Sequence, residues 1–148
     1  MKLFTLLCTS ALLTAAFAAD PAANNTSNTA APLKQVSEKA MAAQKEALAI
    51  EGLLKARHVN LTEATARAEA LHQHVVDMHT AAQAVESDLP EAEKMKASVD
   101  VLKVLTENKA KKISGVSNGG DRERFRATAK NIAMRAEQIL KTSRKIGG

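Results

Sequence analysis

The chain has 148 residues, a length that suits one domain, and carries a net charge of +5. Its hydrophobic fraction of 45% is ordinary, but three Phe and no Trp or Tyr exclude a core built on large aromatic rings, and six Gly and three Pro argue against an all-β sandwich rich in tight turns. The single Cys excludes an intramolecular disulfide, a Cys-based zinc site and covalent c-type haem attachment.

The first 18 residues have the pattern of a secretory signal peptide. Lys2 is followed by an apolar run from Leu3 to Leu13 and by the A-x-A cleavage site that ends at Ala18. This run is shorter than the roughly 20 apolar residues that a transmembrane helix needs. We therefore expect an exported protein, periplasmic or secreted. Because Cys8 lies in the segment removed after Ala18, the mature chain is expected to have no thiol.

Residues 19–31 are expected to form a flexible linker, because they contain no large apolar side chain to bury. Asn24, Asn25 and Asn60 each begin an Asn-x-Ser/Thr sequon, which matters only in a host that glycosylates its exported proteins. The remaining residues, 32–148, are predicted to form one helical domain.

Apolar residues after Pro32 recur at spacings of three and four, the pattern of helices in bundles and coiled coils. We predict four helical stretches, the third of them broadened by Val101, Val104 and Leu105. Their apolar stripes are Leu33, Val36, Ala40, Ala43, Ala47, Ile50 and Leu54; Leu61, Ala64, Ala68, Leu71, Val75, Met78, Ala82, Val85 and Leu89; Ala92, Met95, Val99, Leu102 and Ile113; and Phe125, Ala129, Ile132, Ala136, Ile139, Ser143 and Ile146.

The predicted helix ends carry capping residues. Asn60 and Asp88 each precede a Glu by three residues, which is the spacing of a capping box. Residues 114–121 form a Gly-rich loop, and Asp121 at its end is expected to cap the last helix.

The first two stripes are complementary in size. If the chain folds back at residues 58–60, Leu54 faces Ala64, Val75 faces Ala43, and each other large residue of the first hairpin also meets an alanine. Such alternation favours an antiparallel helical hairpin with a close approach. We therefore predict an all-α fold, an up-down-up-down four-helix bundle with an Ala-rich heptad core. A long two-hairpin coiled coil that dimerises is the alternative.

Charge is divided along the chain. Residues 19–102 hold eight Lys/Arg and twelve Asp/Glu, for a net charge of −4, whereas residues 103–148 hold twelve Lys/Arg and four Asp/Glu, for a net charge of +8. Lys109, Lys111 and Lys112 precede the last helix. Six basic residues of that helix are predicted to lie opposite its apolar stripe and to bind a partner, namely Arg122, Arg126, Lys130, Lys141, Arg144 and Lys145.

A basic helix face has two interpretations. It is either a solvated outer face or the contact surface for an acidic protein, an anionic lipid or an anionic polysaccharide. Sequence-specific nucleic-acid binding does not fit an export signal, and the one Phe after residue 17 offers little for stacking on single strands.

The sequence lacks the common catalytic patterns. After residue 18 it has no Cys, G-x-S-x-G motif, Walker loop or dinucleotide loop, so we predict no enzymatic activity and no cofactor. Glu69 and His72 form one Glu-x-x-His, which di-iron bundles use twice, and they flank the stripe. His74, Asp77 and Met78 have the spacing of a surface metal clamp, which leaves metal binding open.

These observations predict an exported, non-enzymatic helical bundle that binds an anionic partner or surface through its C-terminal helix. A structural or self-assembling envelope protein is the first alternative, because the acidic and basic halves could pair between chains to form a homo-oligomer. A periplasmic metal- or cofactor-binding bundle is the second alternative.

Overall fold

The computed structural model describes residues 25–116 and 119–148. Its helices are α1 (Asn25–Lys55), α2 (Leu61–Gln83), α3 (Pro90–Thr106), α4 (Lys109–Ser114) and α5 (Gly119–Gly147). These two ranges contain no strand, so the predicted all-α class is confirmed. The predicted signal peptide and the first part of the predicted linker lie outside the described residues.

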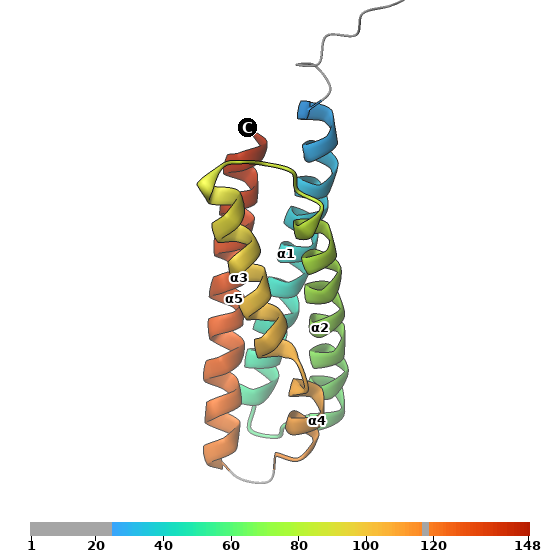
Figure 1. Ribbon diagram of the computed structural model, residues 1–148. Helices are drawn as coiled ribbons and strands as arrows, with labels where there is room; N and C mark the ends of the chain where they lie inside the picture. The colour runs from blue at the N-terminus through green and yellow to red at the C-terminus, as the bar shows by residue number, and fades with distance from the viewer. Residues whose placement is uncertain (1–24, 117–118) are drawn as a thin grey trace, which may run out of the picture.

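The four long helices run alongside one another, and the short helix α4 lies at the end where α1 leads into α2 (Figure 1). Contacts join α1 to α2, α2 to α3, α3 to α5, and α5 back to α1, while α4 packs against α2. Each long helix thus has two long neighbours, as in a bundle. None of the described helices is both long and apolar enough to cross a membrane.

Ion pairs between α1 and α2 show how these two helices are aligned. Lys39 Nζ lies 2.6 Å from Asp77 Oδ2, and Glu46 Oε2 lies 3.0 Å from Arg67 Nη1. Residue numbers therefore rise along α1 while they fall along α2. The helices α1 and α5 show the same opposition in Figure 1.

The predicted stripes supply most of the core. All seven stripe residues of α1 are buried, and Ala40, Ala43 and Ala47 are fully so. Ile50 and Ala68, which the predicted pairing places opposite one another, line the same small cavity. In α5 the stripe is widened by two further buried residues, Ala133 and Leu140. The buried residues thus keep the predicted spacing of three and four.

One of the three predicted caps is confirmed. The backbone N–H of Glu63 donates to Asn60 Oδ1 at 3.1 Å, which satisfies a donor that would otherwise lack a partner in the first turn of α2. The cap predicted at Asp88 is wrong, because α3 begins one residue later and its N-cap is Leu89. The cap predicted at Asp121 is also wrong, since α5 begins at Gly119 and Asp121 lies inside its first turn.

The predicted third helix is broken into α3 and α4. Asn108 has a φ of 58°, a left-handed conformation that Asn tolerates better than most residues and that ends a right-handed helix. The expected broadening by Val101 and Val104 is wrong, because their side chains are 43% and 71% exposed. The buried stripe instead continues from Leu102 to Thr106, so the two valines fall on the opposite side of α3.

The ends of the first hairpin also differ from the prediction. Helix α1 begins at Asn25, so residues 25–31 of the predicted linker are helical. Thr29 Oγ1 donates to the backbone oxygen of Glu86 at 3.0 Å and ties this extension to the loop after α2. Helix α2 ends at Gln83, so Leu89 is not part of its stripe and is 49% exposed.

We predict that Leu71→Ala lowers the free energy of unfolding by about 2–5 kcal/mol, because Leu71 is only 2% exposed and its truncation leaves a cavity in the core. Leu48→Ala is the matched control, since Leu48 is 50% exposed and should change stability by less than about 1 kcal/mol. Urea denaturation followed by circular dichroism measures both. Equal losses in the two variants would contradict the assignment of Leu71 to the core.

Candidate functional site

The six basic residues predicted to bind a partner divide into two groups. Arg122 and Arg126 are half-buried where α5 packs against α1. The others are exposed: Lys130, Lys141, Arg144 and Lys145. The expectation that all six lie opposite the apolar stripe is therefore not met at Arg122 and Arg126, which flank the stripe and reach α1.

Arg122 caps the end of α1. Its Nε donates to the backbone oxygen of Leu54, and its Nη2 donates to the backbone oxygen of Ala56. The last carbonyls of a helix have no partner within the helix, and a cation there also interacts favourably with the helix dipole. Arg122 thus holds the first turn of α5 against the C-terminus of α1.

Arg126 forms an ion pair with α1. Its Nε donates to Glu51 Oε1 at 2.9 Å, and its Nη1 lies 3.3 Å from an oxygen of Glu123 on its own helix. The hydrogen bond from Arg126 lowers the pKa of the Glu51 carboxyl below its ordinary value. The charge of Arg126 is therefore already balanced within the fold.

The four exposed residues have weaker or no internal partners. Lys141 pairs with Glu137 at 2.7 Å and remains 74% exposed, and Lys145 pairs with Glu91 of α3 at 3.0 Å and remains 72% exposed. Exposed pairs of this kind contribute little to stability and exchange easily with other ions. Lys130 has no hydrogen bond or ion pair within the described ranges.

The exposed residues of α5 continue onto α1. Arg144 Nη2 lies 3.7 Å from Met41 Sδ, which joins the outer sides of the two helices. At about 100° per residue, the exposed residues that share these two sides form one surface. We call this the seam surface, and its exposed basic and apolar members are Lys34, Met41, Lys45 and Leu48 of α1 with Lys130, Met134, Lys141 and Arg144 of α5.

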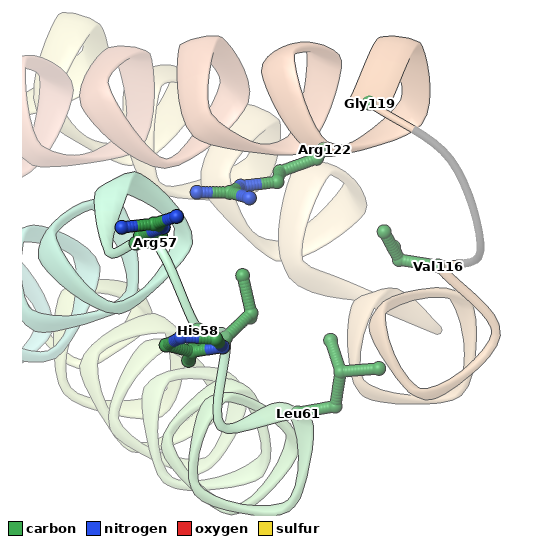
Figure 2. Close-up of a pocket in the computed structure, with 7 residues that line it drawn as sticks. Arg57, His58, Leu61, Val116, Gly119 and Arg122 are labelled. Atoms are coloured by element: carbon green, nitrogen blue, oxygen red, sulfur yellow. The ribbon is translucent and has the colours of Figure 1, made fainter.

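A pocket of about 400 Å³, open to solvent, lies at the end of the bundle where α1 leads into α2. Figure 2 shows Arg57 and His58 of the α1–α2 loop around it, together with Arg122 of α5. We call it the end cavity, and its described lining is Arg57, His58, Val59, Leu61, Val116, Gly119 and Arg122, with no acidic residue among them. No local sequence pattern indicates this site, because Arg57 and Arg122 are far apart along the chain and only the fold brings them together.

A second basic cleft lies at the same end. It has a volume of about 250 Å³ and is lined in part by Lys109, Lys112 and Arg124, with Asp121 as its acidic member. Burial lowers the pKa of the Lys109 ammonium, and the nearby charge of Lys112 lowers it further. This end of the bundle therefore gathers basic groups from α4, α5 and the α1–α2 loop.

The His residues of α2 do not converge on a metal-binding geometry. His72 Nδ1 lies 3.0 Å from Thr106 Oγ1 of α3, while Glu69 is exposed. Of the three residues with the spacing of a metal clamp, Asp77 is held by Lys39, and Met78 is fully buried in the core. Within residues 25–116 and 119–148, no three His, Cys, Asp or Glu side chains are placed to hold a metal ion.

Comparison with known proteins identified no relative of this chain. No protein-family model, curated protein or solved structure matches the chain.

We predict that Asp77→Asn and Glu51→Gln lower the melting temperature at pH 7, because hydrogen bonds from Lys39 and Arg126 lower the pKa values of these carboxyls. A carboxyl whose pKa is lower in the folded chain stabilises the fold above its unfolded pKa, about 4. That contribution disappears as the pH falls through the folded pKa. The difference from the wild type should therefore shrink as the pH falls below about 4.

Thermal unfolding followed by circular dichroism across this pH range measures the effect. Glu69→Gln is the control, since Glu69 is exposed and should leave the melting temperature nearly unchanged at every pH. A loss in Asp77→Asn that stays constant down to pH 2 would contradict the electrostatic origin of the effect.

Proposed function

We propose that this protein is an exported, non-enzymatic up-down-up-down four-helix bundle that binds an anionic partner or surface through the seam surface of α1 and α5. Export rests on the signal-peptide pattern of the first 18 residues. The observation that carries the binding proposal is the combination of exposed basic and exposed apolar side chains on the seam surface.

The basic side chains of the seam surface are available to a partner. Lys130 has no hydrogen bond or ion pair within the described ranges, and the side chain of Arg144 has one hydrogen bond there, to the sulfur of Met41. Lys34 and Lys45 of α1 are also exposed. Two carboxylates lie near these cations: Glu51 is paired with Arg126 and also interacts electrostatically with Lys130, and Glu137 is paired with Lys141. The five cations of the seam surface outnumber them. The seam surface therefore carries a local positive charge that attracts anions.

The apolar side chains favour a partner that offers more than charge. Met41 is 44% exposed, Leu48 is 50% exposed and Met134 is 63% exposed. Apolar side chains beside long cationic ones suit an anionic lipid surface or an acidic amphipathic protein, because the cations contact the charged groups while the apolar groups lose contact with water.

We predict that the triple substitution Lys130→Gln/Lys141→Gln/Arg144→Gln weakens binding to anionic phospholipid vesicles about tenfold or more at low ionic strength. Wild-type binding should itself weaken steeply as salt rises to the physiological range, because screening shortens the reach of exposed charges. Co-sedimentation with vesicles of increasing phosphatidylglycerol content measures binding, and a sulfated polysaccharide tests the soluble form of the same charge.

The matched control is Lys94→Gln/Lys111→Gln/Arg135→Gln, which removes the same charge from exposed positions outside the seam surface. It should weaken binding less than threefold. Equal losses in the two triple variants would show that net charge alone acts, and no salt-sensitive binding to any anionic probe would overturn the proposal.

Exposed valines on α3 favour self-assembly as a second candidate function. Val101 and Val104 lie with exposed Ala97 at spacings of four and three, so they form a short apolar stripe that faces away from the core. If this stripe pairs with a second copy, the mass measured by light scattering rises with concentration and Val104→Lys prevents the rise. A wild-type monomer at every concentration would exclude this candidate.

A further inference from the structure

The end cavity holds positive charge that no acidic group in its described lining balances. Arg57 and His58 come from the loop between α1 and α2, and Arg122 comes from the first turn of α5. Figure 2 shows the guanidinium groups of Arg57 and Arg122 on the same side of the cavity, where Arg122 extends from α5 toward the end of α1. Like charges gathered in this way repel one another, and a bound anion relieves the repulsion.

The two arginines have donors to spare. Arg122 uses its Nε and one N–H of Nη2 on the carbonyls of Leu54 and Ala56, so its Nη1 and the second N–H of Nη2 remain. Arg57 is exposed, and neither Arg57 nor His58 has a hydrogen bond or ion pair within the described part of the chain. The bonds to α1 fix the orientation of Arg122, and such preorganisation lowers the entropic cost of binding an anion.

The two positive charges of Arg57 and Arg122 favour one class of anion over others. Two guanidinium groups match a group that carries up to two negative charges and three oxygens, which is a phosphate monoester. A carboxylate has one charge and two oxygens, so it would leave one guanidinium unbalanced. The remaining wall is apolar, formed by Val59, Leu61 and Val116, and the volume of about 400 Å³ falls in the range of small-molecule sites.

We propose that the end cavity binds a soluble small molecule that consists of a phosphate monoester and a small apolar body. Arg57 and Arg122 hold the phosphate, His58 donates a further hydrogen bond, and the apolar wall contacts the body of the ligand. Lys130, Lys141 and Arg144 do not line the cavity, so this site is separate from the seam surface and its test is independent of the proposed function.

Isothermal titration calorimetry of the full chain with phenyl phosphate, inorganic phosphate and benzoate tests the proposal. Phenyl phosphate should bind with a stoichiometry of one, inorganic phosphate more weakly, and benzoate at least tenfold more weakly than phenyl phosphate. Arg57→Gln should weaken binding of phenyl phosphate at least tenfold. Because Arg57 has no internal partner, this variant should keep the wild-type melting temperature, so that its loss of binding is not a loss of fold.

Arg124→Gln is the matched control, since it removes the same charge from the same end of the bundle but outside the end cavity. It should weaken binding less than twofold. Equal losses in the two variants, equal binding of benzoate and phenyl phosphate, or no heat with phenyl phosphate would each overturn the proposal. Binding to vesicles of phosphatidic acid without binding to phenyl phosphate would also overturn it, because the phosphate would then come from a membrane.

Discussion

The close packing of α1 against two neighbours is the constraint on which the rest of the structure depends. Ala40, Ala43 and Ala47 are fully buried, and α1 contacts both α2 and α5 along its length. Alanine side chains let helix backbones approach closely, and larger residues on the facing helices then fill the space between them. The position of α1 in turn determines which basic residues of α5 meet a carboxylate or carbonyl and which face water.

This packing divides the basic residues of α5 into those that bind α1 and those that remain exposed. Near its C-terminus α1 offers the carboxylate of Glu51 and its last carbonyls, and these hold Arg126 and Arg122. Farther along α5, Lys130 and Arg144 form no ion pair with a carboxylate within the described ranges and remain exposed. The same interaction that fixes Arg122 also aims it at the end cavity beside Arg57. The bundle thus separates basic residues that hold helices together from basic residues that can bind an anion.

The helices and most of the core could be predicted from the sequence, because a helix that is buried on one side has apolar residues at every third or fourth position. It could not predict the break at Asn108, since Ile113 continues the apolar pattern beyond it and is buried as expected. The site was less predictable. Whether Arg122 faces solvent or a carbonyl of α1 depends on how closely two segments that are distant in the sequence approach each other. The same is true of the proximity of Arg57 and Arg122 at the end cavity, and no local sequence pattern indicates either.

The most direct test of this division between structural and anion-binding residues compares two double variants that remove the same charge from α5. Arg122→Gln/Arg126→Gln should lower the free energy of unfolding, while the protein that remains folded keeps most of its salt-sensitive affinity for anionic vesicles. Lys130→Gln/Lys141→Gln should keep the wild-type free energy of unfolding and lose most of that affinity. The measurement is vesicle affinity and urea denaturation on the same preparations. Equal loss of affinity in both variants, or equal loss of stability, would contradict the account.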